Sequence, residues 1–253
     1  MKRLISLLAL LVSLCALAPG AFSDGEGLPV PAGDALRGYS KKEGYVYVSL
    51  GAYPTDGDGT VRPILWRVLS TDGISAYLLS EYILEAGRIH SDRNTYRSWD
   101  TSDLFMYLNG VFRDTAFSED DQKLLINRTE DGGLVTLITA SEMQSAELGF
   151  VSNNARRCLS TDYAKTTGDP KKLYIYSKGH CYSPLWSRTR SDTNKNQQRR
   201  VMDEGKTGRI DVQAGDLGVR PAVNIDLRVC LILSGAGTME DPYVLGWNSA
   251  EDE

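Results

Sequence analysis

Two apolar segments joined by an Asp-Gly pair constrain the fold more than any other feature of the sequence. The segments are RPILWRVLS (residues 62–70) and ISAYLLSEYIL (residues 74–84), and Asp72 and Gly73 lie between them. An Asp-Gly pair between apolar runs is typical of the tight turn of a β-hairpin. The alternating segment YVYVSLGAYP, which ends at Pro54, precedes the pair. We therefore expect an N-terminal unit of three antiparallel strands that begins near Tyr45.

The middle of the chain has the pattern of short helices. Ser102 is placed to cap a helix whose buried face has the i, i+3, i+4, i+7, i+8 spacing. The residues with this spacing are Leu104, Tyr107, Leu108, Val111 and Phe112. Ser118 and Asp121 have capping-box spacing ahead of a second helix, and Thr139 and Glu142 repeat it after the strand-like GLVTLIT. Three helix starts so close together predict a helical layer.

Strand signals return from Lys172. The segments KLYIY, SPLWSRT, RRVMDEGKTGRIDVQ and LGVRPAVNIDL favour an antiparallel meander, and a last strand, YVLGW, follows Pro242. Strands, helices and strands thus follow one another without a regular βαβ alternation. The sequence predicts an α+β fold in which an antiparallel β-meander and hairpins lie beside a helical layer.

The first residues have the pattern of a secretory signal peptide. Lys2 and Arg3 precede an apolar run, residues 4–17, and small residues follow it. We expect residues 1–22 to be removed and the protein to be secreted and extracellular. A lipid anchor at Cys15 is disfavoured because Leu14 stands where such signals have a small residue. No later stretch approaches about 18 apolar residues, so we expect no membrane insertion after cleavage.

The remaining chain divides by composition into two parts. Residues 23–42 are rich in Gly and Pro and are expected to form a flexible leader. Residues 43–253 are expected to form a single α+β domain with a C-terminal β appendage from about residue 228. The formal net charge of −5 becomes more negative when the signal peptide leaves. This balance argues against nucleic acid and anionic membrane surfaces as partners.

Three cysteines follow the signal peptide. They are Cys158, Cys181 and Cys230. In an oxidising compartment we expect a disulfide between Cys158 and Cys181, because both lie in polar, loop-like surroundings. Cys230 lies in the apolar run LRVCLIL, which is typical of a buried thiol. Three free thiols are the alternative.

The segment LGVRPAVNID (residues 217–226) carries an arginine and a proline inside a strand-like pattern. Alternation places Arg220 on the face opposite Val219 and Val223. A partly buried guanidinium needs a partner, so we expect a structural clamp between Arg220 and Asp226 or a carboxylate of the neighbouring strand. Pro221 has no N–H and predicts an edge or a bulge.

Two further residues make a ligand site the alternative for this region. A bulge could direct Arg220 and Arg188 into one cleft that binds an anion or sugar hydroxyls. Trp186 could stack on a sugar ring, although burial in the core is the more common fate of a tryptophan. The candidate ligand-binding residues are therefore Trp186, Arg188 and Arg220.

No catalytic motif is present in the sequence. It has no nucleophile elbow, phosphate loop or dinucleotide fingerprint. A glycan-acting hydrolase needs two facing carboxylates, and its candidates cannot be paired from the sequence. These candidates are Glu81, Asp100, Asp162 and Asp216.

Calcium is the one cofactor that the sequence leaves open. SDTNKNQ places Asp192, Asn194 and Asn196 at alternate positions, and DGDG offers Asp56 and Asp58. Neither segment has the glycine and terminal glutamate of a complete calcium loop. We therefore expect a solvated turn at both places.

Six segments occur in an order known from a bacterial family. They are LGAYP (50–54), ILWRVL (64–69), YLNGVFRDTAFSEDDQKLL (107–125), RRCLSTDYAK (156–165), LWSRT (185–189) and GVRPAVNI (218–225). In this order they resemble the bacterial domain of unknown function 6273 family, over about Tyr45 to Leu227. That family is common in secreted and surface proteins of Gram-positive gut bacteria, which implies the same setting here.

The segment around Trp186 and Arg188, followed by a meander that ends in an arginine strand, also resembles the C-type-lectin-like fold. Formylglycine-generating enzymes and surface-adhesion modules use this fold, and fold analogy alone carries no function. Our leading hypothesis is a secreted, non-catalytic module that binds a glycan, a cell-wall fragment or a protein at the bacterial surface or extracellularly. The alternatives are an oxidase of the formylglycine-generating type, for which Cys230 stands alone near the end of the fold, and a glycan-acting hydrolase.

Overall fold

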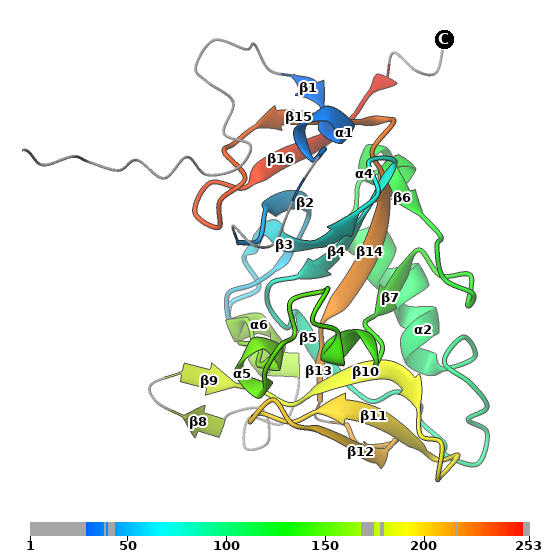
Figure 1. The fold of residues 1–253 in the computed structure, drawn as a ribbon. Helices are drawn as coiled ribbons and strands as arrows, with labels where there is room; N and C mark the ends of the chain where they lie inside the picture. Colours follow the sequence, from blue (N-terminus) through cyan, green and yellow to red (C-terminus); the bar gives the residue numbers. More distant parts are fainter. Residues whose placement is uncertain are drawn as a thin grey trace, which may run out of the picture.

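The computed structural model describes residues 29–37, 39, 44–167, 175–177, 180–215 and 217–249, with the backbone alone for residues 175–177 and 180–181. The predicted signal peptide, residues 1–22, and the first part of the predicted leader lie outside the described residues. The described chain is a mixed α+β structure in which most strand pairs are antiparallel (Figure 1). The α+β prediction is therefore confirmed at this level.

The larger sheet contains nine strands within the described residues. Their order is β1, β15, β16, β2, β3, β4, β14 and β6, and β7 also pairs with β14. The strands are β1 (Val30–Pro31), β2 (Tyr47–Pro54), β3 (Val61–Thr71), β4 (Ser75–Ser80), β6 (Leu125–Ile126), β7 (Val135–Leu137), β14 (Pro221–Asp226), β15 (Cys230–Ser234) and β16 (Tyr243–Trp247). All of these pairs are antiparallel except β16 with β2, which is parallel.

The predicted three-stranded unit is present as β2, β3 and β4. The turn between β3 and β4 is closed by Asp72, whose Oδ1 accepts hydrogen bonds from the backbone N–H of Ile74 at 3.0 Å and of Ser75 at 2.7 Å. Gly73 has a φ of 81°, a left-handed conformation that glycine adopts without a steric penalty. The hairpin prediction from the Asp-Gly pair is confirmed.

A second sheet lies below the first in Figure 1 and has the order β12, β11, β10, β13, β5. Its strands are β5 (Glu85–Gly87), β10 (Leu185–Arg190), β11 (Gln197–Val201), β12 (Thr207–Asp211) and β13 (Leu217–Val219). β10, β11 and β12 form the predicted antiparallel meander. The first and last predicted strands of the meander lie elsewhere. KLYIY contributes to β8 (Ile175–Ser177), which pairs with β9 (His180–Tyr182), and most of LGVRPAVNIDL forms β14 in the larger sheet.

The chain passes between the two sheets at two neighbouring places. β4 runs on towards β5, and β13 runs on into β14. β4 pairs with β14 in the larger sheet, and β5 pairs with β13 in the smaller one, both antiparallel. The two sheets therefore share one bent pair of chain segments.

Short helices cover one face of the larger sheet. They are α2 (Asp103–Tyr107), the π-helix η2 (Leu108–Phe112), α3 (Arg113–Ala116) and α4 (Glu119–Leu124). Ser102 caps α2 by accepting from the N–H of Phe105, and Ser118 forms the predicted capping box with Asp121. The predicted buried face is wrong at Val111, which is 63 % exposed. The π-turn adds backbone within this stretch and so shifts the helical phase.

Four further helices of the described chain lie elsewhere. They are α1 (Ala32–Ala35), the 3-10 helix η3 (Glu142–Gln144), α5 (Asn153–Arg156) and α6 (Asp162–Thr167). Thr139 and Glu142 exchange the predicted capping hydrogen bonds, since the N–H of Thr139 donates to Glu142 and the N–H of Glu142 donates to Thr139. Only a single 3-10 turn follows them.

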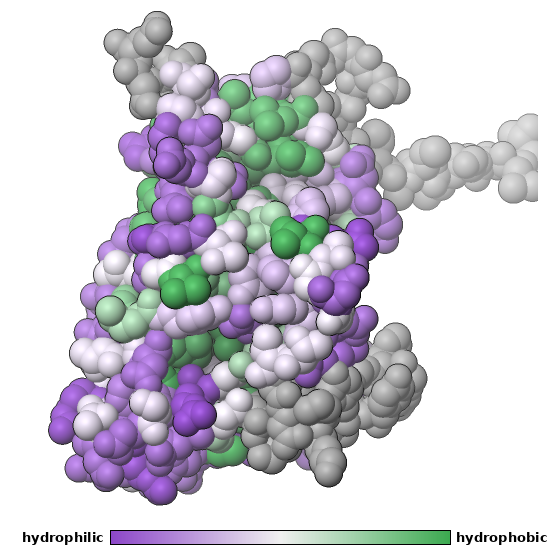
Figure 2. All heavy atoms as spheres, turned by 180° about the vertical axis from the view of Figure 1, so that it is seen from behind, coloured by the Kyte–Doolittle hydropathy of each residue, from purple (hydrophilic) through white to green (hydrophobic). Residues whose placement is uncertain are grey.

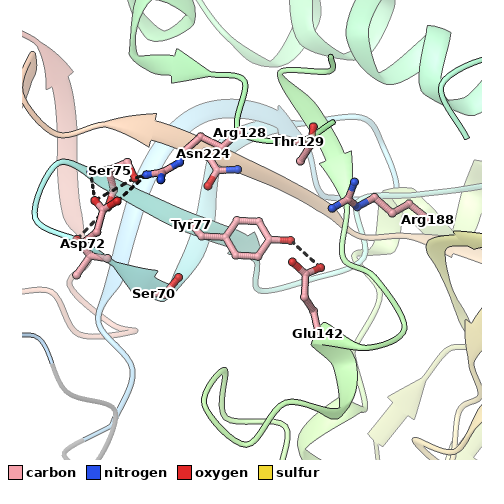
Figure 3. A pocket seen from close by; sticks show the side chains of 10 residues that line it. Ser70, Asp72, Ser75, Tyr77, Arg128, Thr129, Glu142, Arg188 and Asn224 are labelled. Atoms are coloured by element: carbon pink, nitrogen blue, oxygen red, sulfur yellow. Dashed lines mark hydrogen bonds and ion pairs between the residues drawn. The ribbon is translucent and has the colours of Figure 1, made fainter. Parts of the chain in front are cut away.

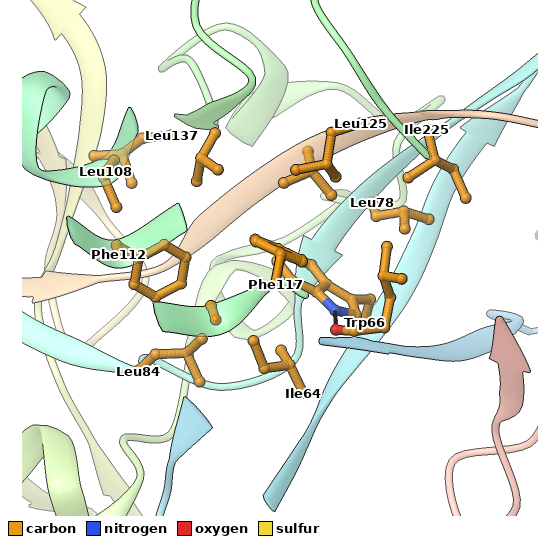
Figure 4. Packing of buried hydrophobic residues seen from close by; sticks show 14 of the residues in the cluster. Ile64, Trp66, Leu78, Leu84, Leu108, Phe112, Phe117, Leu125, Leu137 and Ile225 are labelled. Carbon is orange, nitrogen blue, oxygen red and sulfur yellow. Dashed lines mark hydrogen bonds between the residues drawn. The ribbon is translucent and has the colours of Figure 1, made fainter. Parts of the chain in front are cut away.

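Two apolar clusters lie on opposite faces of the larger sheet. Successive residues of β4 separate them, because Leu78 belongs to one cluster and Leu79 to the other. The larger cluster lies under the helices and includes Trp66, Phe112 and Phe117 (Figure 4). The smaller cluster joins the other face to η3, α6 and the second sheet; its members include Met143, Ala164, Leu185 and Val201. The larger sheet is therefore covered on both faces around β4 and β14.

Two predicted boundaries need correction. The described part of the leader is ordered, since β1 pairs with β15 and the side chains of Ala32 and Leu36 are buried in the larger cluster. The C-terminal strands are not an appendage, because β16 pairs with β2 and β15 lies between β1 and β16. The apolar residues Ile232, Tyr243 and Leu245 connect these strands to the core.

The surface of the described chain mixes polar and apolar residues. Figure 2 shows hydrophobic residues in separate patches with hydrophilic ones around them. Within the part of the chain that is described, no helix is long and apolar enough to cross a membrane.

Candidate functional site

Arg220 lies where the chain crosses from β13 to β14. Leu79 pairs with Ala222, and Glu85 pairs with Val219. Between these pairs lie residues 80–84 on one segment and only residues 220–221 on the other, so the longer segment forms an arch. Arg220 Nε donates to the carbonyl of Ser80 at 2.7 Å, and its Nη2 donates to that of Glu81 at 3.3 Å. The guanidinium thus donates hydrogen bonds to carbonyl groups that no longer pair with the neighbouring strand.

The surroundings of Arg220 make it a structural residue. Its side chain is 1 % exposed, and burial lowers the pKa of its guanidinium. The predicted carboxylate partner is wrong, because the acceptors are backbone carbonyls and Asp226 pairs with Arg228 at 2.5 Å. Pro221 predicted either a sheet edge or a bulge. The unequal lengths of the two segments at the crossing support the bulge, and β14 is not an edge strand because it has neighbours on both sides.

Trp186 is also part of the core. Its side chain is fully buried on β10, and its Nε1 donates to the carbonyl of Gly87 at 2.7 Å. An indole in this position has no face free to stack on a sugar. The structure thus shows the core placement that the sequence favoured, and not the sugar-stacking role.

Arg188 differs from these two residues because it lines a cavity. The cavity, which we call the Tyr77 cavity, has a volume of about 410 Å³. Pockets of 300–1,000 Å³ are typical of small-molecule sites. Its lining residues are all polar: Ser70, Thr71, Asp72, Ser75, Tyr77, Arg128, Thr129, Glu142, Arg188 and Asn224.

The cavity is built from five separate segments (Figure 3). Tyr77 on β4 and Asn224 on β14 are cross-strand partners and form its floor. Arg128 follows β6, Glu142 lies in η3, and Arg188 lies on β10. The site therefore depends on the contact between the larger sheet and the second sheet.

The carboxylates that line the Tyr77 cavity already have donors. Asp72 pairs with Arg128 Nη1 at 2.7 Å, and this contact and the turn N–H groups lower the pKa of Asp72. Glu142 accepts from the N–H and hydroxyl of Thr139 and, at 3.5 Å, from the hydroxyl of Tyr77. Burial, and then the charge of Glu142, raise the pKa of Tyr77, so its hydroxyl stays a neutral donor.

The guanidinium groups of Arg128 and Arg188 each keep N–H donors that make no hydrogen bond within the described residues. Arg188 pairs with Asp131 through Nη1 at 2.9 Å, and its buried Nε has no acceptor within the described chain. Arg128 uses only Nη1, which contacts Asp72 and the hydroxyl of Ser75. Across the described residues, the side-chain amide of Asn224 also makes no hydrogen bond. An acceptor-rich ligand would satisfy these groups.

Sequence reasoning found Arg188 but missed Tyr77, Arg128, Glu142 and Asn224. Arg188 and Arg220 do not share the cavity, because Arg220 is buried at the crossing between the sheets. The one sequence signal that pointed to a missed residue was the alternation of side chains along residues 217–226, which placed Asn224 on the same strand face as Arg220. The other residues are distant in sequence, and no local pattern connects them.

The cysteines do not form a described catalytic pair. Cys158 is a buried free thiol that donates to the carbonyl of Glu81, and burial raises its pKa. Cys230 is a buried free thiol in the other apolar cluster, where burial raises its pKa to about 12. The side chain of Cys181 lies outside the described residues, so the Cys158–Cys181 disulfide stays a prediction.

The carboxylates suggested for hydrolysis lie apart. Glu81 forms a largely buried ion pair with Arg67 at 2.5 Å. Asp100 and Asp162 line two different cavities, and Asp216 lies outside the described residues. None of the three described candidates lines the Tyr77 cavity.

The two suggested calcium segments form turns. Asp56 pairs with Arg62, and Asp192 pairs with Arg199. Asn194 accepts from the N–H of Asn196 within its own loop. Over the described ranges, no group of three or more His, Cys, Asp or Glu side chains is arranged to hold a metal ion.

Comparisons with protein-family models, with curated proteins and with solved structures each found no match for this chain.

Proposed function

We propose that the protein is a secreted, non-catalytic α+β module that binds a carboxylate-bearing sugar unit of a glycan or cell-wall fragment in the Tyr77 cavity. The observation that carries the proposal is the surplus of donors described above. Both lining carboxylates are engaged, while Arg128 and Arg188 each keep free guanidinium donors. Nε and Nη2 lie on the same edge of the Arg188 guanidinium, the fork that binds a carboxylate in a bidentate manner, and the buried Nε has no acceptor among the described residues.

The character of the lining favours a sugar over an apolar ligand. Every residue around the cavity is polar, and hydroxyl groups of Ser70, Thr71 and Thr129 line it beside the phenol of Tyr77. Such a lining offers both donors and acceptors to sugar hydroxyls. We also propose membership of the domain of unknown function 6273 family, on the order of the six segments given above, and a C-type-lectin-like fold, on the segment around Trp186 and Arg188 and the meander after it.

Binding of galacturonate by the purified protein, compared with binding of galactose, tests the proposal. Arg188→Lys keeps a cation beside Asp131 but removes the fork. We expect it to weaken galacturonate binding by about 10- to 100-fold, since hydrogen bonds to charged groups contribute about 1.5–3 kcal/mol. Isothermal titration calorimetry, run with calcium and with a chelator, measures both affinities.

Arg199→Lys is the matched control for this variant. Arg199 Nη2 pairs with Asp192 at 2.9 Å on β11, away from the cavity, as Arg188 pairs with Asp131 at 2.9 Å. Both variants should retain the melting temperature of the parent. Equal binding of galactose and galacturonate, or equal losses in the two variants, would contradict the proposal.

A further inference from the structure

A second polar cavity lies beside the first. We call it the Trp99 cavity; its volume is about 370 Å³. Its lining residues are Arg97, Ser98, Trp99, Asp100, Glu130, Asp131, Thr139, Arg188, Thr189 and Arg190. Arg188 lines both cavities. One side chain therefore forms the wall between them.

Two other elements also connect the cavities. The loop after β6 lines the Tyr77 cavity with Thr129 and the Trp99 cavity with Glu130 and Asp131. Thr139 lines the Trp99 cavity and donates its N–H and hydroxyl to Glu142, which lines the Tyr77 cavity. The dividing wall is thus the ion pair of Arg188 and Asp131 together with this short loop. A ligand held in one cavity lies next to the other.

The Trp99 cavity has an unused donor of its own. Trp99 is 6 % exposed, and its buried Nε1–H has no acceptor among the described residues. Buried donors without acceptors are rare in folded proteins. Arg188 Nε, in the wall between the cavities, is a second such donor. Both nitrogen atoms are covered by protein atoms, so a ligand oxygen reaches them only when neighbouring side chains move aside.

We infer that the Trp99 cavity is a second subsite, and that the ligand is an acidic oligosaccharide of at least two sugar units that crosses the Arg188–Asp131 pair. This inference rests on the function proposed above. A sugar chain carries ring, hydroxyl and glycosidic oxygens along its whole length, so it supplies acceptors to the polar side chains that line both cavities. The lining also favours it, because Trp99 is the one apolar side chain among the residues around the two cavities.

The test compares ligand lengths in the parent protein and in Trp99→Phe. The variant keeps an aromatic ring against Phe105, whose centroid lies 5.8 Å from that of Trp99, and removes the Nε1–H together with the five-membered ring of the indole. The probes are galacturonate and mannuronate as monomers, dimers and trimers, together with triglutamate as a peptide. Trp247→Phe, on β16, is the matched control. Affinities come from calorimetry, and melting temperatures check folding.

We expect the dimer and trimer of one series to bind at least 10-fold more tightly than its monomer. Trp99→Phe should reduce this gain about 10-fold and leave monomer binding unchanged. Dimers and trimers that bind the parent protein no better than monomers would overturn the second subsite, while the proposed function would stand. This comparison does not depend on whether the Trp99→Phe variant folds. Triglutamate that binds more tightly than every saccharide would overturn the sugar assignment. If no monomer and no oligomer binds, the proposed function itself fails.

Discussion

Arg220 is a buried cation whose hydrogen-bond acceptors are two carbonyl oxygens of the arch at residues 80–84. A charge without a carboxylate partner is costly to bury. The arch explains why it is retained, because the carbonyl of Ser80 would otherwise lack a donor at the crossing between the sheets, while that of Glu81 also accepts from the thiol of Cys158. Its Nη1 makes no hydrogen bond within the described residues, so the arrangement is not fully satisfied.

Replacement of Arg220 should therefore affect stability and not binding. We expect Arg220→Ala to lower the free energy of unfolding by about 3 kcal/mol, since it leaves a cavity and removes the donor of the Ser80 carbonyl. Arg199→Ala, at an exposed ion pair, should lower it by less than about 1 kcal/mol. Urea titration followed by circular dichroism measures both. Unchanged stability of Arg220→Ala combined with lost galacturonate binding would return Arg220 to the ligand site.

Single residues show how far the sequence could predict this structure. The alternation of residues 217–226 predicted which side chains share a face, and Asp72–Gly73 predicted the hairpin, because both are local effects of backbone geometry. The partners of Arg220 were not predictable, since an arch of free carbonyls appears only once two distant segments pair. The Tyr77 cavity was hidden for the same reason. Arg188 was named as a cleft partner of Arg220, whereas its actual partner, Asp131, lies on a distant loop.

At the scale of elements, an irregularity in β2 fixes how the helices lie on the sheet. The register of β2 against β3 shifts between Ser49 and Ala52, and Gly51 within this bulge has a φ of 67°. A Cβ on Gly51 would lie 2.4 Å from the carbonyl oxygen of Ala116, at the end of α3. The strand and the helix can thus approach each other only because this position is glycine. The sequence marked neither this bulge nor the π-turn of η2, since both depend on packing between elements.

Gly51→Ala should be strongly destabilising. Both the left-handed backbone and the contact with Ala116 oppose a methyl group, so we expect a loss of about 2–4 kcal/mol in the free energy of unfolding. Gly57→Ala is the matched control, because a Cβ there meets no atom within 4 Å. Thermal melts of the two variants provide the comparison. Equal melting temperatures would show that β2 can move away from α3 at little cost.

For the whole molecule, the last strands are part of the central sheet. β16 lies between β15 and β2, and Cys230, Ile232, Tyr243 and Leu245 from these strands are buried in the larger apolar cluster. The strand that ends the described chain therefore pairs directly with one of the first strands. Local sequence patterns predicted the strand but not this parallel pairing, which is a long-range contact.

Truncation tests this arrangement. A chain that ends after Leu227 loses β15 and β16, exposes an edge of β2 and leaves apolar core residues uncovered. We expect it to lose its cooperative thermal transition and to aggregate. A control chain that lacks only residues 250–253 should melt like the parent. A truncated chain that still unfolds cooperatively would restore the view of a separate C-terminal appendage.

The bent pair of segments that both sheets share also limits how such a chain can change during evolution. β4 and β5 follow each other on one segment, and β13 and β14 follow each other on the other, so neither sheet is encoded by a continuous stretch of its own. A recombination event that replaced the strands of one sheet would also separate, along the gene, strands that pair with each other in the other sheet. We expect the two sheets, and the cavities formed where they meet, to be inherited together.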